Sequence, residues 1–162
     1  MALDMFIDMG AIKGESRDKE NKDKIDILAW SWGMSQSGTT HTGGGGGSGK
    51  ANFQDLSFTK YIDSSSNALM NALAKGKHLE KCVLIVRKAG EGQHKYIGIT
   101  MEEVLVTSIS TGGSGGEDRL TENVTLNFGK VSFAYTPQDA KGTVSGDKTF
   151  TWNIAENDGN VA

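Results

Sequence analysis

The stretch FIDMGAIKGESRDKENKDKIDILAWSWG, Phe6 to Gly33, decides the fold of this chain. Two apolar segments typical of β-strands flank a turn crowded with charges of both signs, and Trp30 and Trp32 close the second segment. A turn of mixed charge stays solvated and carries no strong net sign. Because the stretch holds no catalytic grouping, we interpret it as scaffold and surface.

Length and charge limit the possible classes of protein. A chain of 162 residues fits one domain spanning positions 1–162, with a single core. The net charge is −3, and basic and acidic residues are mixed along the chain, so we expect no nucleic-acid partner. The single cysteine, Cys82, excludes an internal disulfide, and we expect a buried neutral thiol that needs no oxidising compartment.

The beginning MALDMFIDMG has acids at Asp4 and Asp8 and lacks a basic start followed by an apolar run, so we expect no secretory signal peptide. The longest apolar run, Cys82 to Val86, is far shorter than the roughly 20 residues that span a bilayer. We therefore expect folding in the cytoplasm and no membrane insertion.

Alternation of apolar and polar residues recurs along the chain and predicts a mainly β protein. A bulge or bend is expected at Gly129–Lys130, because Phe128 and Val131 lie three positions apart and a regular strand would place them on opposite faces. The predicted strands are Asp4–Met9, Lys24–Trp32, Gln54–Tyr61, Lys81–Lys88, His94–Thr100, Glu103–Ser110, Thr121–Phe128, Val131–Tyr135 and Lys148–Ile154.

One helix is predicted over Asn67–Lys75. Three serines, 64 to 66, offer N-caps, Gly76 stands where a C-terminal left-handed residue is common, and one apolar face consists of Leu69, Ala72 and Leu73. Many short strands with one helix favour a small closed β-barrel, because closure removes exposed strand edges. The expected core residues are Trp30, Trp152, Phe128, Ile85, Ile99 and Val106, which would fill the barrel and leave no room for an internal ligand.

Within the second strand we expect Leu28, Trp30 and Trp32 to point inward. Ile27, Ala29 and Ser31 would then face outward.

No motif for chemistry is convincing. Gly44–Lys50 satisfies the GxxxxGK part of a phosphate-binding loop, but Ala51 stands where a hydroxyl should bind magnesium, and a strand rather than a helix is expected next. The histidines, His41, His78 and His94, lack metal-ligand spacing. We expect no catalytic residues, no metal and no cofactor.

Several segments together resemble the haemolysin-coregulated protein family, the tube proteins of type VI secretion, and they follow the order of that family over nearly the whole length. They are IKGES (Ile12–Ser16), IDILAWSWG (Ile25–Gly33), FTKYID before the serine-capped helix (Phe58–Asp63), VRKAGEGQHKYIGI (Val86–Ile99) and ENVTLNF with the following aromatic strand (Glu122–Tyr135).

The resemblance implies a barrel of two sheets flanked by one helix, assembled into six-membered rings with a central channel. Rings would stack into a tube that a contracting sheath propels out of the cell. The implied partners are further copies of the chain, a spike at the tube tip, the sheath, the baseplate and small effector proteins in the channel. Such export needs no signal peptide, so the chain would be cytoplasmic before firing and extracellular afterwards.

Two hypotheses about sites follow. Ser31, and with it Ala29, is predicted to line the channel, because both are small and alternate with two tryptophans. Ring stacking is assigned to two glycine-containing loops, with an ordinary surface loop as the alternative for both. The loop residues are Gly38, His41, Gly44, Gly49 and Lys50 in the first, and Ala89, Gly90, Glu91, Gly92 and Gln93 in the second.

A rival reading is a monomeric β domain that binds a carbohydrate or another small ligand. It would use exposed aromatic side chains such as Trp32 or Tyr61.

Overall fold

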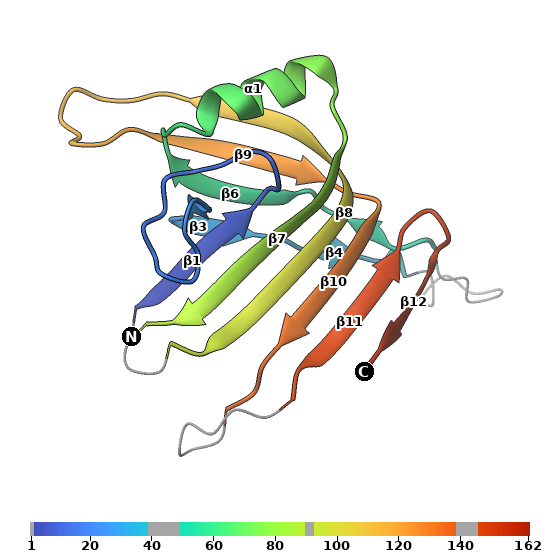
Figure 1. Ribbon diagram of the computed structural model, residues 1–162. Helices are drawn as coiled ribbons and strands as arrows, with labels where there is room; N and C mark the ends of the chain where they lie inside the picture. The colour runs from blue at the N-terminus through green and yellow to red at the C-terminus, as the bar shows by residue number, and fades with distance from the viewer. Residues whose placement is uncertain (1, 39–48, 90–92, 139–145) are drawn as a thin grey trace.

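A computed structural model describes residues 2–38, 49–89, 93–138 and 146–162. In these residues the chain forms twelve strands and one helix, which lies across one end of the strands (Figure 1). The elements are β1 (Leu3–Asp8), β2 (Ile25–Asp26), β3 (Ala29–Ser31), β4 (Met34–Ser35), β5 (Asn52–Phe53), β6 (Leu56–Tyr61), α1 (Ser66–Lys75), β7 (Leu79–Lys88), β8 (Lys95–Thr111), β9 (Thr121–Asn127), β10 (Lys130–Tyr135), β11 (Lys148–Asn153) and β12 (Asp158–Val161).

Two layers share the long strand β8. Its first part belongs to a seven-strand layer in the order β12-β11-β10-β8-β7-β1-β2, and its last part, Leu105–Thr111, joins a four-strand layer in the order β8-β9-β6-β3. The sequence predicted two strands here, but they are one strand of 17 residues. The strand turns the corner at Glu103, whose φ of 55° lies in the left-handed region. Pairing with β7 and β10 before the bend, and with β9 after it, explains why the two predicted strands are a single element.

The expected closed barrel is not formed by the described strands. The sheet is open, with edges at β2, β12 and β3, and β4 and β5 form a separate pair. The reason lies in Ile25–Ser31, which divides its pairing between the layers: Ile27 N donates to Met5 O at 3.0 Å, and Leu28 N donates to Thr59 O at 2.8 Å. Only two residues pair with β1 and three with β6, so no continuous ladder joins the layers here.

This change of partner also corrects the expected alternation. Ile27 is buried, with 6% of its surface exposed, whereas Leu28 is 40% exposed. Ala29 and Ser31 are exposed as predicted, and Trp30 packs against the core. A bend between two consecutive residues shifts the inward set by one position, which a regular strand does not allow.

The core fills the space between the two layers. Of the predicted core residues, Ile99, Val106 and Phe128 are buried, and Trp30 and Trp152 are partly buried and packed against them. The prediction that Ile85 belongs to the core was wrong. Its neighbours on β7, Leu84 and Val86, point inward, and Ile85 faces the other side.

Helix α1 agrees closely with its prediction. It begins at Ser66, ends at Lys75, and is closed by Gly76 with φ of 60°. Its buried side chains are Ser66, Leu69 and Ala72, whereas Leu73, expected on the apolar face, is 36% exposed. The helix therefore rests on the strands by a narrow stripe.

The chain also bends where the sequence predicted, between β9 and β10. Phe128 and Val131 are both buried, at 5% and 3% exposure, and Gly129 N donates to Glu102 O at 3.0 Å. The bend carries the chain from the four-strand layer into the seven-strand layer.

Candidate functional site

The exposed face of the four-strand layer is built from small uncharged side chains. Register places them in two rows that cross all four strands. One row is Ala29, Thr59, Asn123 and Ser110, and the other is Ser31, Ser57, Thr125 and Ser108. We call these two rows the uncharged face.

Hydrogen bonds tie the side chains of this face together. Thr59 Oγ1 and Asn123 Oδ1 are 2.6 Å apart, and Thr107 Oγ1 lies 2.7 Å from Thr125 Oγ1. Beside the rows, Asp55 accepts hydrogen bonds from Thr107 at 2.8 Å and from Asn127 at 2.9 Å. The side chains are thereby held along the sheet, and the face presents hydroxyl, amide and methyl groups.

The two charged side chains of the four-strand layer, Lys60 and Glu122, point inward. They are directly opposite each other on β6 and β9, and both are buried, at 0% and 1% exposure. Lys60 Nζ forms an ion pair with Glu122 Oε1 and donates to Ser66 Oγ at 3.1 Å, at the start of α1. Because the layer's own charges neutralise each other inside, its outer side carries none from the strands that form it.

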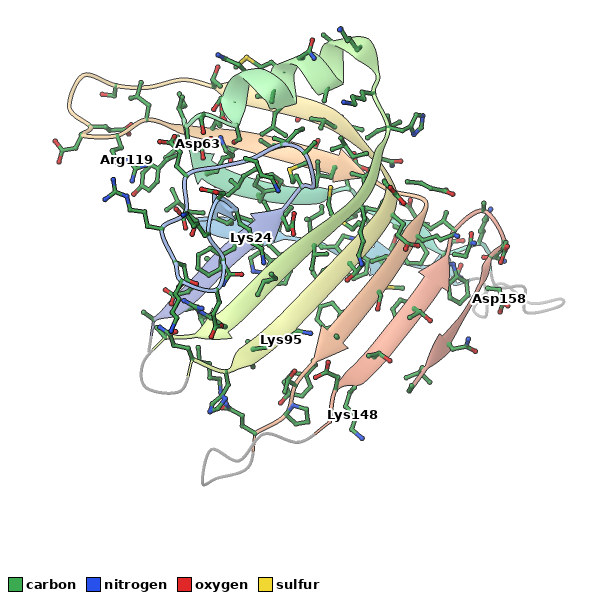
Figure 2. All side chains as sticks on the ribbon, in the orientation of Figure 1. Lys24, Asp63, Lys95, Arg119, Lys148 and Asp158 are labelled. Atoms are coloured by element: carbon green, nitrogen blue, oxygen red, sulfur yellow. The ribbon has the colours of Figure 1, made fainter. Side chains whose placement is uncertain are left out.

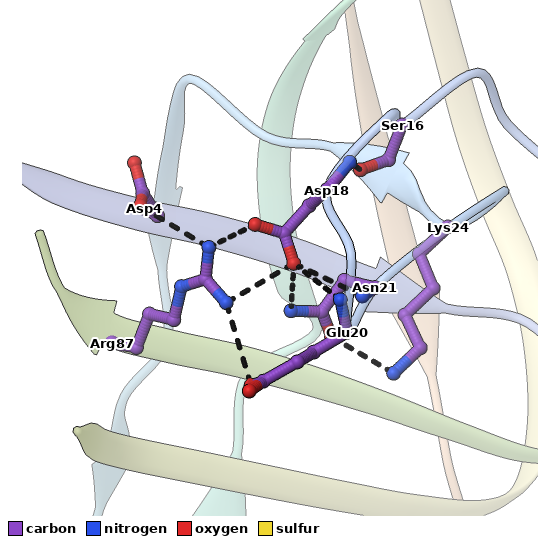
Figure 3. A network of polar contacts seen from close by, with 7 residues as sticks. All are labelled: Asp4, Ser16, Asp18, Glu20, Asn21, Lys24 and Arg87. Carbon is purple, nitrogen blue, oxygen red and sulfur yellow. Dashed lines mark hydrogen bonds and ion pairs between the residues drawn. The ribbon is translucent and has the colours of Figure 1, made fainter. Parts of the chain in front are cut away.

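A second polar cluster lies on the seven-strand layer and holds a strap, residues 13–24, against it (Figure 3). Arg87 is buried, at 3% exposure, and its guanidinium pairs with Asp18 and lies 3.4 Å from Asp4 and 3.7 Å from Glu20. The hydrogen bond from Arg87 holds the pKa of the Asp18 carboxyl below its usual value. The guanidinium carbon also stands 5.2 Å from the centre of the Phe6 ring, so the cluster covers an apolar side chain.

The aromatic side chains proposed for a ligand-binding domain are not a free platform. Trp32 stacks within a cluster that includes Phe53 and Phe133, at centroid distances of 6.4 and 6.3 Å. Tyr61 is covered by the Arg119 guanidinium at 3.7 Å. Arg119 and Asp63 lie at the same end of the molecule, away from Asp158 on β12 (Figure 2), and line an open pocket of about 400 Å³ with mixed charge.

The structure brings the predicted channel residues, Ala29 and Ser31, onto the uncharged face. Their six row neighbours were not predicted, although alternation within FTKYID and ENVTLNF could have indicated three of them, Thr59, Asn123 and Thr125. Among the predicted stacking residues, Gly38, Gly49, Lys50 and Gln93 are exposed and Ala89 is half-buried. His41, Gly44, Gly90, Glu91 and Gly92 lie outside the described residues.

Within the described ranges, no three His, Cys, Asp or Glu side chains are placed to hold a metal ion together. Cys82 is fully buried, and desolvation raises the pKa of its thiol to about 12. In the part of the chain that the structure describes, no helix has the length and apolar character needed to cross a membrane.

The fold and this surface define a class: a β-structured building block that presents an uncharged face. Comparison with known proteins identifies the family within this class. A profile of the family described as "Type VI secretion system effector, Hcp" matches residues 6–135. Protein hcp1 of Pseudomonas aeruginosa is 63% identical over 159 residues, covering 97% of this chain and 98% of the relative.

Solved structures agree with this match. One described as a type six secretion system protein superposes with a TM-score of 0.92 at 28% identity, covering 98% of this chain and 100% of its own. Hcp1 from Salmonella typhimurium superposes with a TM-score of 0.82 at 33% identity, covering 99% and 100%. The chain belongs to the Hcp family of type VI secretion, and its role is that of a structural, secreted tube component. The predicted resemblance is confirmed, and the small-ligand alternative finds no support.

Proposed function

We propose that six copies of this chain, each folded as one domain over residues 1–162, close into a ring with a central channel. Rings stack into a tube that leaves the cell with small effector proteins inside. The observation that carries this proposal is the uncharged face, whose two rows cross four strands without one charged side chain. Such a face suits a channel wall, because the side chains of its two rows form no ion pairs with cargo of either charge, and the Asp55 carboxylate at their border is already hydrogen-bonded to Thr107 and Asn127.

We assign the channel lining to Ser31 and Ala29, together with their row neighbours. Ser31 lies opposite Ser57 on β6, and Ala29 lies opposite Thr59. All are small enough to leave the channel open, while the hydroxyl groups can exchange hydrogen bonds with many protein surfaces.

Replacing Ser31 with Glu tests this assignment. In six copies the change places a ring of carboxylates in the channel, and we expect proteins that copurify with the rings to fall at least several-fold when quantified by mass spectrometry. Thr151→Lys, on the far side of the seven-strand layer, is the control that adds a charge outside the channel. Unchanged cargo in the Ser31→Glu rings would remove Ser31 from the lining.

Ring stacking is assigned to the segments 38–50 and 89–93. The described ends of both lie at the surface, and Ala89 N donates to Ala2 O at 3.1 Å, which fixes the base of the second segment. Shortening the first segment should reduce tube growth in electron micrographs and leave single rings intact. Tubes of unchanged length would assign the segment to ordinary surface.

We further propose that the chain is cytoplasmic before firing, that the sheath, baseplate and spike are its partners, and that it has no catalytic activity of its own. Native mass spectrometry and electron microscopy of the purified protein test the core of the proposal. A uniform closed ring with a central hole is expected. A protein that stays solitary at high concentration would contradict it.

A further inference from the structure

The buried charges Lys60 and Glu122 join three elements at one point. Besides its ion pair with Glu122, Lys60 Nζ lies 3.1 Å from Asp63 Oδ1, in the turn before α1. Ser66, the first residue of α1, donates from its Oγ to Glu122 Oε1 at 2.6 Å. These polar contacts hold the beginning of the helix to β6 and β9.

Stability alone does not require this buried pair. The cost of removing two charges from water often matches or exceeds their attraction, and apolar side chains of similar size can replace such a pair without loss. Here the cost is increased further, because Glu122 Oε2 is buried and has no hydrogen-bond partner. What the pair supplies, and apolar side chains do not, is a fixed direction of contact.

Helix α1 depends on that fixed direction. It buries only two apolar side chains, Leu69 and Ala72, so apolar packing constrains its position weakly. The polar contacts at its first turn therefore add a directional constraint to the packing of Leu69 and Ala72 in the core.

The outer side of α1 is the surface whose position matters. Apart from Lys75 at its end, α1 has no charged residue, and Met70 and Leu73 are 41% and 36% exposed. An uncharged, partly apolar helix side is typical of a surface that a partner covers. Since a ring needs two different matching surfaces on each copy, the counterpart on the next copy should be equally free of charge. The β3 edge meets this condition, because β3 contains no charged residue; the edge is also open, and Leu28 beside it is 40% exposed.

We propose that Lys60 and Glu122 are positioning residues for ring assembly. Through Ser66 and Asp63 they hold α1 so that its uncharged outer side docks on the β3 edge of a second copy. This inference rests on the proposed function, because it requires the ring.

The first test replaces both charges together, Lys60→Met with Glu122→Met. We expect the double variant to stay folded, with a melting temperature within about 5 °C of wild type, and its ring fraction by native mass spectrometry to fall about tenfold. Each single variant leaves one buried charge unpaired and should lower the melting temperature by about 10 °C or more. The control pair is Lys95→Met with Asp147→Leu, which removes an exposed ion pair of 3.5 Å and should leave rings unchanged.

Normal rings in the double variant would overturn the positioning role. If the double variant does not fold, Ser66→Ala tests the positioning role instead, because it removes only the hydroxyl that joins the pair to the helix. It should fold and show a several-fold smaller ring fraction, and unchanged rings would again overturn the role. A wild-type protein that forms no ring refutes the proposed function instead, so the two failures are distinguishable.

The second test addresses the docking surface. Met70→Glu should abolish rings with little change in melting temperature, since Met70 is exposed, and adding Leu28→Lys should restore them by pairing opposite charges across the contact. If rings still form in Met70→Glu, the outer side of the helix is not part of the contact between copies. If adding Leu28→Lys does not restore rings, the β3 edge is not its counterpart.

Discussion

The two polar clusters of this molecule differ in where their charged side chains lie. In the four-strand layer, the charges of the strands are turned inward and paired at Lys60 and Glu122, which leaves an uncharged outer face. On the seven-strand layer, Arg87 gathers three carboxylates at the surface and uses them to fasten the strap of residues 13–24. The difference shows that alternation decides only which side chains point outward. Whether an outward face carries charge depends on where a few charged residues are placed along the strands.

The largest expected loss of stability comes from replacing Arg87, the central residue of the charged cluster. Arg87→Met removes a buried guanidinium that holds the accessible carboxylates of Asp18, Asp4 and Glu20, and we expect the free energy of unfolding to fall by about 2 kcal/mol. Urea denaturation measures this, with Lys95→Met as a control that should cost less than about 1 kcal/mol because its ion pair is exposed. Equal losses in both variants would show that burial of Arg87 contributes nothing.

Acid should weaken the strap before it affects the uncharged face. The pKa of Asp18 is lowered in the folded protein, chiefly by its hydrogen bond from Arg87, so its stabilising effect is present above the ordinary carboxyl pKa and is lost as the pH falls through the folded value. Asp18→Asn should therefore be less stable than wild type at pH 7, and the gap should close toward pH 3. Urea midpoints across this range measure it, and a constant gap would contradict the assignment.

At the corner between the two layers, a substitution should change stability by less than Arg87→Met does, and should raise the free energy of unfolding. Glu103 occupies the left-handed region with φ of 55°, which costs a side-chain-bearing residue about 1 kcal/mol relative to glycine. Glu103→Gly should thus raise the free energy of unfolding by somewhat less than about 1 kcal/mol, since glycine loses more entropy on folding. Thermal unfolding compares it with Glu103→Ala, and equal gains in both would point to the side chain rather than the backbone.

The smallest effect on stability should accompany a large effect on function. Ser57→Lys adds a charge to the uncharged face at a half-buried position and should change the free energy of unfolding by no more than about 0.5 kcal/mol. Cargo retained by the rings should nevertheless fall, because six lysines would face the channel. Full retention, measured by mass spectrometry of the purified rings, would show that the face tolerates charge.

Sequence patterns predicted most of the strands, the helix and the outward orientation of Ala29 and Ser31, because each depends on local alternation or capping, but they missed β4 and β12. They could not predict where a chain changes partner. The bend between Ile27 and Leu28, and the continuation of β8 through Glu103, are set by pairing between distant strands. The expectation of a closed barrel was wrong for the same reason.

The polar clusters were not predictable by local patterns. Arg87 and Asp18 are separated by 69 positions, and Lys60 and Glu122 by 62, so nothing near either residue in the sequence indicates its partner. A lysine and a glutamate on amphipathic strands look like surface residues until the register places them opposite each other inside. Their burial became visible only with the full topology.

The buried thiol of Cys82 bears on what happens to exported copies. Disulfide exchange requires a thiolate that a second sulfur can reach, and a pKa of about 12 with no exposed surface provides neither at physiological pH. A secreted copy of this chain therefore has no accessible thiolate through which Cys82 could join it covalently to a neighbour.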